Sequence, residues 1–82
     1  MTANWVMREF LEFIICQLAE FPDDAVITEI PSGRNINFRL QLRQSDVGRI
    51  IGRNGQTIQA IRALLSSSAS RHNQRATLEI IE

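Results

Sequence analysis

The spacing of apolar residues near the start of the chain predicts an amphipathic helix. Two stripes recur at three- and four-residue intervals, the first made of Met7, Leu11, Ile14, Leu18 and Phe21 and the second of Val6, Phe10 and Phe13. We expect both stripes to face a core. Thr2 or Asn4 is suited to cap this helix, and Pro22 disfavours helical backbone at the residue before it, so the helix should end near Glu20.

Two strands are predicted next. Residues 25–30 alternate imperfectly between apolar and polar, and residues 31–35 (Pro-Ser-Gly-Arg-Asn) have the composition of a turn. Residues 36–43 alternate strictly, which predicts a half-buried strand with Ile36, Phe38, Leu40 and Leu42 facing inward. The two strands should pair as a hairpin.

The second half of the chain predicts two helices and a last strand. Ser45 is suited to cap a short helix that begins at Asp46 and is stopped by Gly52-Arg53-Asn54-Gly55. A longer helix should run from Gln56 to Ser70, with its apolar face formed by Ile58, Ile61, Leu65 and Ala69. A polar loop at residues 71–74 precedes a β-rich segment at residues 76–81.

The predicted order of elements is therefore α-β-β-α-α-β, an α+β fold. The connection through two helices should make the second and last strands parallel, which gives a three-stranded mixed sheet with the helices on one face. We expect a single domain over residues 1–82, with the first helix and hairpin in residues 1–44 and the helix-loop-helix and last strand in residues 45–82.

Composition limits the classes of protein that need to be considered. The chain has 82 residues, is 44% hydrophobic and contains one cysteine, so it is globular and forms no internal disulfide. We expect Cys16 to be a buried helix residue and the compartment to be reducing. No apolar run approaches the length of a membrane span, so we expect a soluble cytoplasmic protein.

Charge is distributed unevenly although the net charge is zero. Residues 1–33 carry Arg8 against six carboxylates, a balance of −5, whereas residues 34–75 carry eight arginines against Asp46 alone, a balance of +7. This asymmetry favours a polyanionic partner on one face, although a solvated charged surface would look the same.

The segment that stops the short helix carries the clearest functional signal. A G-x-x-G sequence is common by itself. Here residues 50–58, Ile-Ile-Gly-Arg-Asn-Gly-Gln-Thr-Ile, lie between two predicted helices and resemble the KH-domain signature V/I-I-G-x-x-G-x-x-I. The order of elements resembles the bacterial, type II version of the KH fold.

Residues 45–62 also resemble the KhpA family of small stand-alone bacterial KH proteins. The resemblance lies in the segment Ser45-Asp46-Val47-Gly48-Arg49-Ile50-Ile51-Gly52-Arg53, then Gly55, Thr57-Ile58 and Ala60-Ile61-Arg62. It implies single-stranded RNA binding, a role as an RNA chaperone or post-transcriptional regulator, and a KhpB (Jag) type KH partner. It also implies links to cell-wall homeostasis, cell elongation and cell shape. Asn54 departs from the family, which often has a second basic residue there.

The expected RNA site centres on the G-x-x-G loop. Glycines let the backbone turn and approach a ligand closely, and N–H groups at the start of the longer helix attract an anion. The resemblance implies a clamp on about four nucleotides. The candidate RNA-binding residues are Val47, Arg49, Ile50, Ile51, Gly52, Arg53, Asn54, Gly55, Gln56, Arg71 and Arg75.

These candidates are expected to play different parts. We expect Arg53 and Arg49 to contact phosphates and Asn54 to donate a hydrogen bond. Val47, Ile50 and Ile51 would form an apolar floor for bases, although Ile51 fits a core position equally well. Arg71 and Arg75, with His72, flank the loop before the last strand, which borders the groove in type II KH domains.

Catalysis is not expected. The chain has no G-K-[S/T] sequence, so the glycines do not form a nucleotide-binding P-loop, and Ser66-Ser67-Ser68 has no base beside it. One histidine and one cysteine do not make a metal site, and no cofactor is expected. Two alternatives remain open: an interaction module that no longer binds RNA, and a binder of single-stranded DNA.

A second surface on the longer helix predicts a homodimer. Ala60, Leu64, Ser67 and Ser68 lie at helical spacing on a face next to the core stripe. Small side chains let another helix approach, and a two-fold axis would bring Leu64 against its copy. A single exposed leucine is the alternative explanation.

Overall fold

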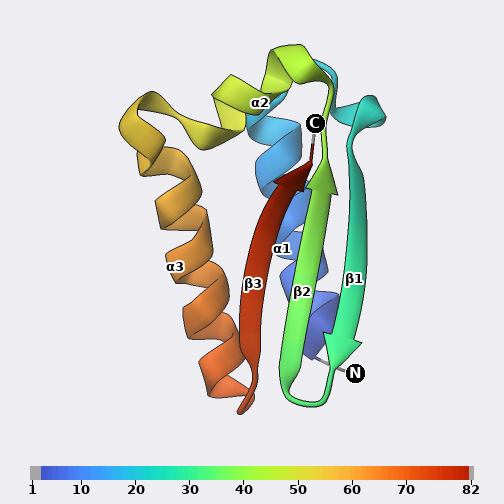
Figure 1. Cartoon of the computed structure of the whole chain (residues 1–82), viewed down its shortest axis with the longest axis vertical. Helices are drawn as coiled ribbons and strands as arrows, with labels where there is room; N and C mark the ends of the chain where they lie inside the picture. Colours follow the sequence, from blue (N-terminus) through green and yellow to red (C-terminus); the bar gives the residue numbers. More distant parts are fainter. Residues whose placement is uncertain (1–2, 82) are drawn as a thin grey trace.

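Helices cover one face of a three-stranded sheet (Figure 1). The computed structural model describes residues 3–81, with side chains from Val6 to Ile81. The elements in chain order are α1 (Ala3–Leu18), the 3-10 turn η1 (Pro22–Asp24), β1 (Val26–Ser32), β2 (Asn35–Gln41), α2 (Gln44–Ile51), the 3-10 turn η2 (Arg53–Gly55), α3 (Gln56–Arg71) and β3 (Arg75–Ile81). The predicted α+β fold with the order α-β-β-α-α-β is confirmed.

The sheet is mixed, with the strand order β1-β2-β3. β1 and β2 form the predicted antiparallel hairpin, and the crossover through α2 and α3 returns β3 parallel to β2. Strand β1 extends through Pro31 to Ser32, so the turn predicted at residues 31–35 is confined to Gly33 and Arg34. Proline is tolerated there because β1 is an edge strand.

The core lies between the sheet and the helices. The side chains predicted to face inward in residues 36–43 and the predicted stripe of α3 are all buried: Ile36, Phe38, Leu40, Leu42, Ile58, Ile61, Leu65 and Ala69. Both sets were predicted by periodicity alone, because a regular element that packs on one face must repeat its apolar positions at its own period.

The buried face of α1 differs from the prediction. Met7, Leu11 and Ile15 are buried, at intervals of four residues, whereas Leu18 and Phe21 are exposed. Leu18 is the last residue of α1 and Phe21 lies beyond it, so neither reaches the sheet. In the second stripe Val6 and Phe13 are also exposed, whereas Phe10 is partly buried and packs against the core. Thr2 and the side chain of Asn4 lie outside the described residues, so the predicted cap stays a prediction.

Two further local predictions are wrong. Cys16 is exposed, because it follows the buried Ile15 by one position and the helix turns it away from the sheet. Helix α2 begins at Gln44 rather than Asp46, with Arg43 at the N-cap and no side-chain cap from Ser45. A tertiary contact, made by the side chain of Asp46, holds this helix start instead. Among residues 3–81, no helix combines the length and hydropathy needed to cross a membrane.

Candidate nucleic-acid interface

The turn between α2 and α3 depends on two glycines in left-handed backbone. Gly52 ends α2 with φ +79°, and its N–H donates to the Gly48 carbonyl at 2.9 Å. A Cβ atom at Gly52 would lie 2.7 Å from the Cβ of Thr57, and still closer to the Thr57 hydroxyl. Gly55 has φ +73° and donates to the Gly52 carbonyl at 3.2 Å, which closes the turn. Only glycine fits at the first position.

The tip of this turn is exposed. Arg53 and Asn54 are both accessible, and Asn54 has φ +58°. Asparagine adopts left-handed backbone more readily than most residues, which is a physical reason for its presence here. Gly55 is the N-cap of α3 and offers no side-chain acceptor. The N–H of Gln56 donates to the Arg53 carbonyl, so an anion or water would meet the later N–H groups of the first turn of α3.

The apolar residues before the turn support it from inside the core. Ile50 is 0% exposed and Val47 is also buried, which contradicts their predicted role as an exposed floor for bases. The amphipathic helix α2 turns them toward the sheet. Ile51 is half-buried at the edge of the core and is the one member of that group with surface beside the turn.

A buried carboxylate holds α2 in place. Asp46 is 0% exposed, and its two oxygens accept the backbone N–H groups of Glu20 and Phe21, each at 2.9 Å. Burial disfavours the charged form of Asp46, but these hydrogen bonds and the guanidinium groups of Arg49 and Arg43 outweigh it and lower its pKa. The start of α2 is therefore fixed to the segment that follows α1. Sequence reasoning missed this contact because the partners are backbone groups remote in the sequence.

Arg49 is held in the same cluster. Its guanidinium lies 2.9 Å from the carboxylate of Glu20 and 3.5 Å from that of Asp46. This places the side chain against the end of α1, where its charge is neutralised. The structure therefore weakens the prediction that Arg49 contacts phosphate.

Salt bridges divide the arginines into two groups. Arg8, Arg39, Arg43 and Arg49 pair with carboxylates. Among the described residues, Arg34, Arg53, Arg62, Arg71 and Arg75 form no such pair, and Arg62 donates instead to the Leu78 carbonyl at 3.2 Å. All five lie along α3 or at its ends, from the G-x-x-G turn to the start of β3. Residues 47–78 contain no acidic side chain, so this edge of the molecule is positive.

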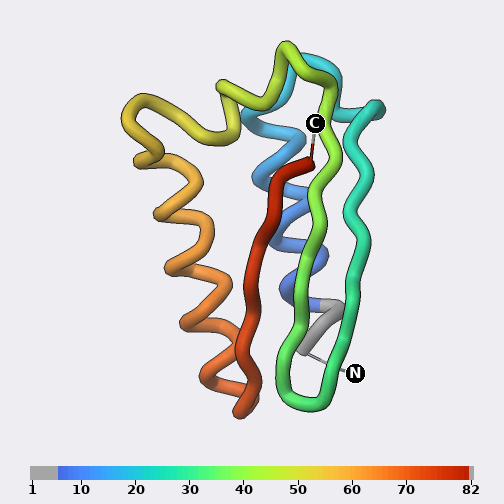
Figure 2. The backbone as a smooth tube through the Cα atoms, viewed as in Figure 1, coloured from blue at the N-terminus to red at the C-terminus, as the bar shows by residue number. Residues whose placement is uncertain are grey.

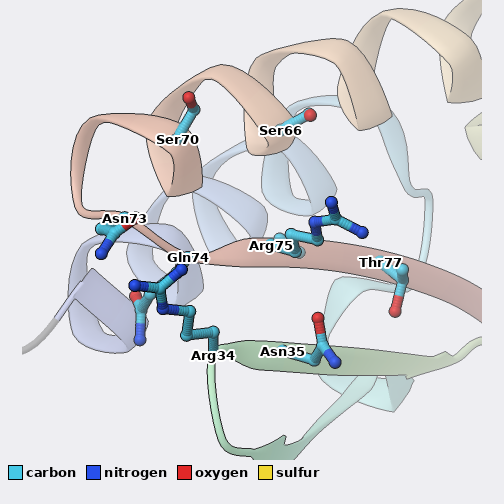
Figure 3. Close-up of a pocket in the computed structure, with 9 residues that line it drawn as sticks. Arg34, Asn35, Ser66, Ser70, Asn73, Gln74, Arg75 and Thr77 are labelled. Carbon is cyan, nitrogen blue, oxygen red and sulfur yellow. The ribbon is translucent and has the colours of Figure 1, made fainter.

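Arg71, His72 and Arg75 lie at the other end of α3 from the G-x-x-G turn (Figure 2). The turn between β1 and β2 meets them there, because the N–H of Arg75 donates to the carbonyl of Arg34 at 2.9 Å. A hollow of about 750 Å³ opens at this end (Figure 3). Arg34 was not among the predicted site residues, since nothing in a hairpin turn indicates which distant segment it meets.

The predicted dimer residues share one side of α3. Leu64 is 56% exposed, Ala60 and Ser67 are exposed, and Ser68 is half-buried. Hydroxyl-bearing Ser66 and Ser70 belong to a different side, which faces the hollow. No group of three or more potential metal ligands occurs among residues 3–81.

Comparison with known proteins identifies the family. The family model described as KhpA/KhpB, KH domain, matches residues 8–80. The chain is 46% identical to the RNA-binding protein KhpA of Chlamydia pneumoniae over 93% of this chain and 97% of that protein. It is 39% identical to the RNA-binding protein KhpA of Borreliella burgdorferi, over 90% of each chain.

The chain is also similar to a more distant KhpA protein. The RNA-binding protein KhpA of Listeria monocytogenes is 34% identical over 93% of this chain and all of that protein. No solved structure matches the chain. The match to the family model covers the G-x-x-G turn, β1, β2, α2 and α3 in full, and most of α1 and β3. The chain therefore belongs to the KhpA/KhpB family of KH domains.

Proposed function

We propose that this protein binds single-stranded RNA and that the G-x-x-G turn is the principal site of contact. The observation that carries the proposal is Arg53, an exposed arginine without a carboxylate partner among the described residues, at the tip of a left-handed glycine turn. A phosphate beside Arg53 would also lie near the positive end of the α3 dipole, in the first turn of that helix. Asn54 would add a hydrogen-bond donor.

The charge along α3 supports the same proposal. The five arginines without carboxylate partners among the described residues lie along α3 or at its ends, whereas the other four arginines pair with six carboxylates elsewhere. A flexible polyanion lying along α3 would therefore meet cations and no acidic side chain. Arg71 and Arg75 would contact this strand remote from the turn, and Ile51, Gly52, Gly55 and Gln56 would contact it close to the turn.

Relatives give the proposal its ligand class. The proteins of Chlamydia, Borreliella and Listeria described above are named RNA-binding proteins. By this resemblance we propose an RNA chaperone or post-transcriptional regulator without enzymatic activity, acting in the cytoplasm with a KhpB (Jag) type partner in cell-wall homeostasis and cell elongation. Single-stranded DNA is the alternative ligand, and competition between RNA and DNA of the same sequence distinguishes them.

A charge reversal at the turn tests the proposal. Arg53→Asp with Asn54→Asp places two negative charges where a phosphate would lie. Aspartate tolerates left-handed backbone nearly as well as asparagine, so the fold should survive. Titration with a labelled oligonucleotide should show loss of binding in the double variant, while its melting curve stays close to that of the wild type. Unchanged affinity in a folded double variant would reject the site and favour an interaction module that does not bind RNA.

A homodimer is the second part of the proposal. Leu64 is exposed among small side chains on α3, and this face is separate from the G-x-x-G turn. Pairing two copies would give two weak RNA sites in one particle and raise the effective concentration of the second site.

A further inference from the structure

A polar hollow lies at the end of α3 that is remote from the G-x-x-G turn (Figure 3). Its volume is about 750 Å³, and its lining includes Arg34, Ser66, Ser70, Gln74, Arg75 and Thr77. These side chains come from the end of α3, the start of β3 and the turn between β1 and β2. The lining holds two arginines with hydroxyl and amide groups, and no carboxylate. A ligand that enters it would meet positive charge and hydrogen-bonding groups.

One group in this hollow is a buried acceptor without a donor. The side-chain oxygen Oε1 of Gln74 is buried and has no hydrogen-bond partner among the described residues. The backbone N–H of Gln74 donates to the Ala69 carbonyl at 2.8 Å, which fixes the residue beneath the end of α3. Leaving a buried acceptor unpaired is unfavourable, so a ligand that brings a donor to this oxygen gains more than it would in water.

The two arginines of the hollow are fixed next to each other by their backbone. The N–H of Arg75, at the start of β3, donates to the carbonyl of Arg34, in the turn between β1 and β2, at 2.9 Å. Neither guanidinium pairs with a carboxylate within residues 3–81, so both are available to an anion. Their side chains can be changed without removing the backbone hydrogen bond that joins the two segments.

We propose that this hollow binds a nucleotide of the same RNA strand that the G-x-x-G turn holds. The guanidinium groups of Arg34 and Arg75 point to different sides of the hollow in Figure 3, so successive phosphates of this RNA strand would lie against them, and the base would donate a hydrogen bond to Gln74 Oε1. A phosphate alone would leave that acceptor unpaired, whereas a base carries ring N–H or exocyclic amino donors beside its phosphate. This inference rests on the proposed function.

The distance between the two sites sets the length of RNA that engages both. Helix α3 runs for 16 residues between them, which is about 24 Å. A strand stacked at about 3.4 Å per nucleotide needs roughly seven nucleotides to cover that distance. The bound segment would thus be longer than the four or so nucleotides that a G-x-x-G turn clamps.

The experiment compares two lengths of RNA. The double variant Arg34→Gln with Arg75→Gln should bind a strand of about twelve nucleotides roughly tenfold more weakly than the wild type, and a four-nucleotide strand equally well. Arg8→Gln with Arg39→Gln is the control matched for net charge, because it also removes two positive charges. Both of these arginines pair with carboxylates, Arg8 with Glu29 and Arg39 with Glu79. It should leave the affinity for both strands unchanged.

Gln74→Leu separates a ligand contact from a structural role. The substitution removes the unpaired acceptor, so the melting temperature should stay the same or rise. Binding of the longer strand should nevertheless fall severalfold. A glutamine that only supported the fold would give the opposite result, with a lower melting temperature and unchanged affinity for RNA.

Two results would overturn the inference. In the first result, the turn variant Arg53→Asp with Asn54→Asp loses binding, whereas the hollow variants bind the longer strand like the wild type. The proposed function then stands and the second site is rejected. In the other, the hollow variants and the control variant of Arg8 and Arg39 weaken binding of both strands equally, which is an effect of net charge alone. If the wild type binds neither RNA, the proposed function and the inference fail together.

Discussion

The carboxylate of Asp46 accepts the backbone N–H of Phe21 at 2.9 Å, which joins the helix before the G-x-x-G turn to the segment after α1. A second bond from the N–H of Glu20 completes the clamp. The helix that carries the turn is therefore oriented by a buried charge as well as by apolar packing, and breaking the clamp should affect both stability and the position of the turn.

Stability should depend on the ionisation of Asp46. Its pKa is lower in the folded protein than in the unfolded chain, so the unfolded chain takes up a proton first as pH falls. Ionised Asp46 therefore contributes to the free energy of unfolding. This contribution is complete above the unfolded pKa of about 4 and is lost as pH falls through the pKa of the folded protein. Chemical unfolding of the wild type, measured between neutral and acid pH, should show this fall in the free energy of unfolding. Asp46→Asn should be less stable at neutral pH and show less of this decline; an identical pH dependence in the variant would contradict the assignment.

The three glycines around the turn should respond differently to alanine. Gly52→Ala meets both positive φ and the Thr57 side chain, and should lose roughly 2–4 kcal/mol of unfolding free energy. Gly55→Ala meets only the positive φ, and should lose about 1–2 kcal/mol. Gly48→Ala lies inside α2 with open space around it, and should gain about 0.5–1 kcal/mol. Denaturant titrations of the three variants measure this order, and equal effects would contradict the geometry of the turn.

Salt dependence should distinguish arginines that face RNA from those paired within the fold. Each phosphate contact on a single strand contributes about 0.7 to the slope of log affinity against log salt concentration. Arg53→Ala should reduce that slope by about this amount. Arg39→Ala is the matched control, because its guanidinium lies 3.0 Å from the Glu79 carboxylate on the open face of the sheet. Affinity measured at several salt concentrations tests the difference; equal slopes for both variants would place the RNA elsewhere.

Leu64→Glu should convert the proposed dimer into a folded monomer. The negative charges of two copies would meet across the two-fold axis, and a position 56% exposed in the isolated chain costs little to change. Light scattering at micromolar concentration should give twice the 9.3 kDa chain mass for the wild type and the chain mass for the variant. Gln59→Glu adds the same charge on another side of α3 and should remain dimeric. A wild-type mass of one chain would refute the dimer.

RNA length provides a second measurement on the same variant. A monomer carries one site, so Leu64→Glu should bind a long strand more weakly than the wild type and a four-nucleotide strand about equally. Equal loss for both lengths would mean that Leu64 affects the RNA site itself.

Local patterns in the sequence determined the elements of this protein and the position of the turn that we propose as its principal site. The strict alternation of residues 36–43 predicted β2, and the spacing of Ile58, Ile61, Leu65 and Ala69 predicted α3, because each pattern repeats with the period of the element it builds. Two glycines between two helical patterns located the turn for a related reason, since few other residues adopt positive φ at low cost.

The tertiary structure alone decided which charges stay available and which segments meet. Arg49 and Arg53 are equivalent in the sequence pattern, yet Arg49 pairs with Glu20 from the end of α1 whereas Arg53 does not pair among the described residues. Likewise, only the parallel pairing of β2 and β3 brings Arg34 beside Arg75. Such pairings depend on distances between elements, and those distances arise from packing of the whole chain, so no local pattern contains them.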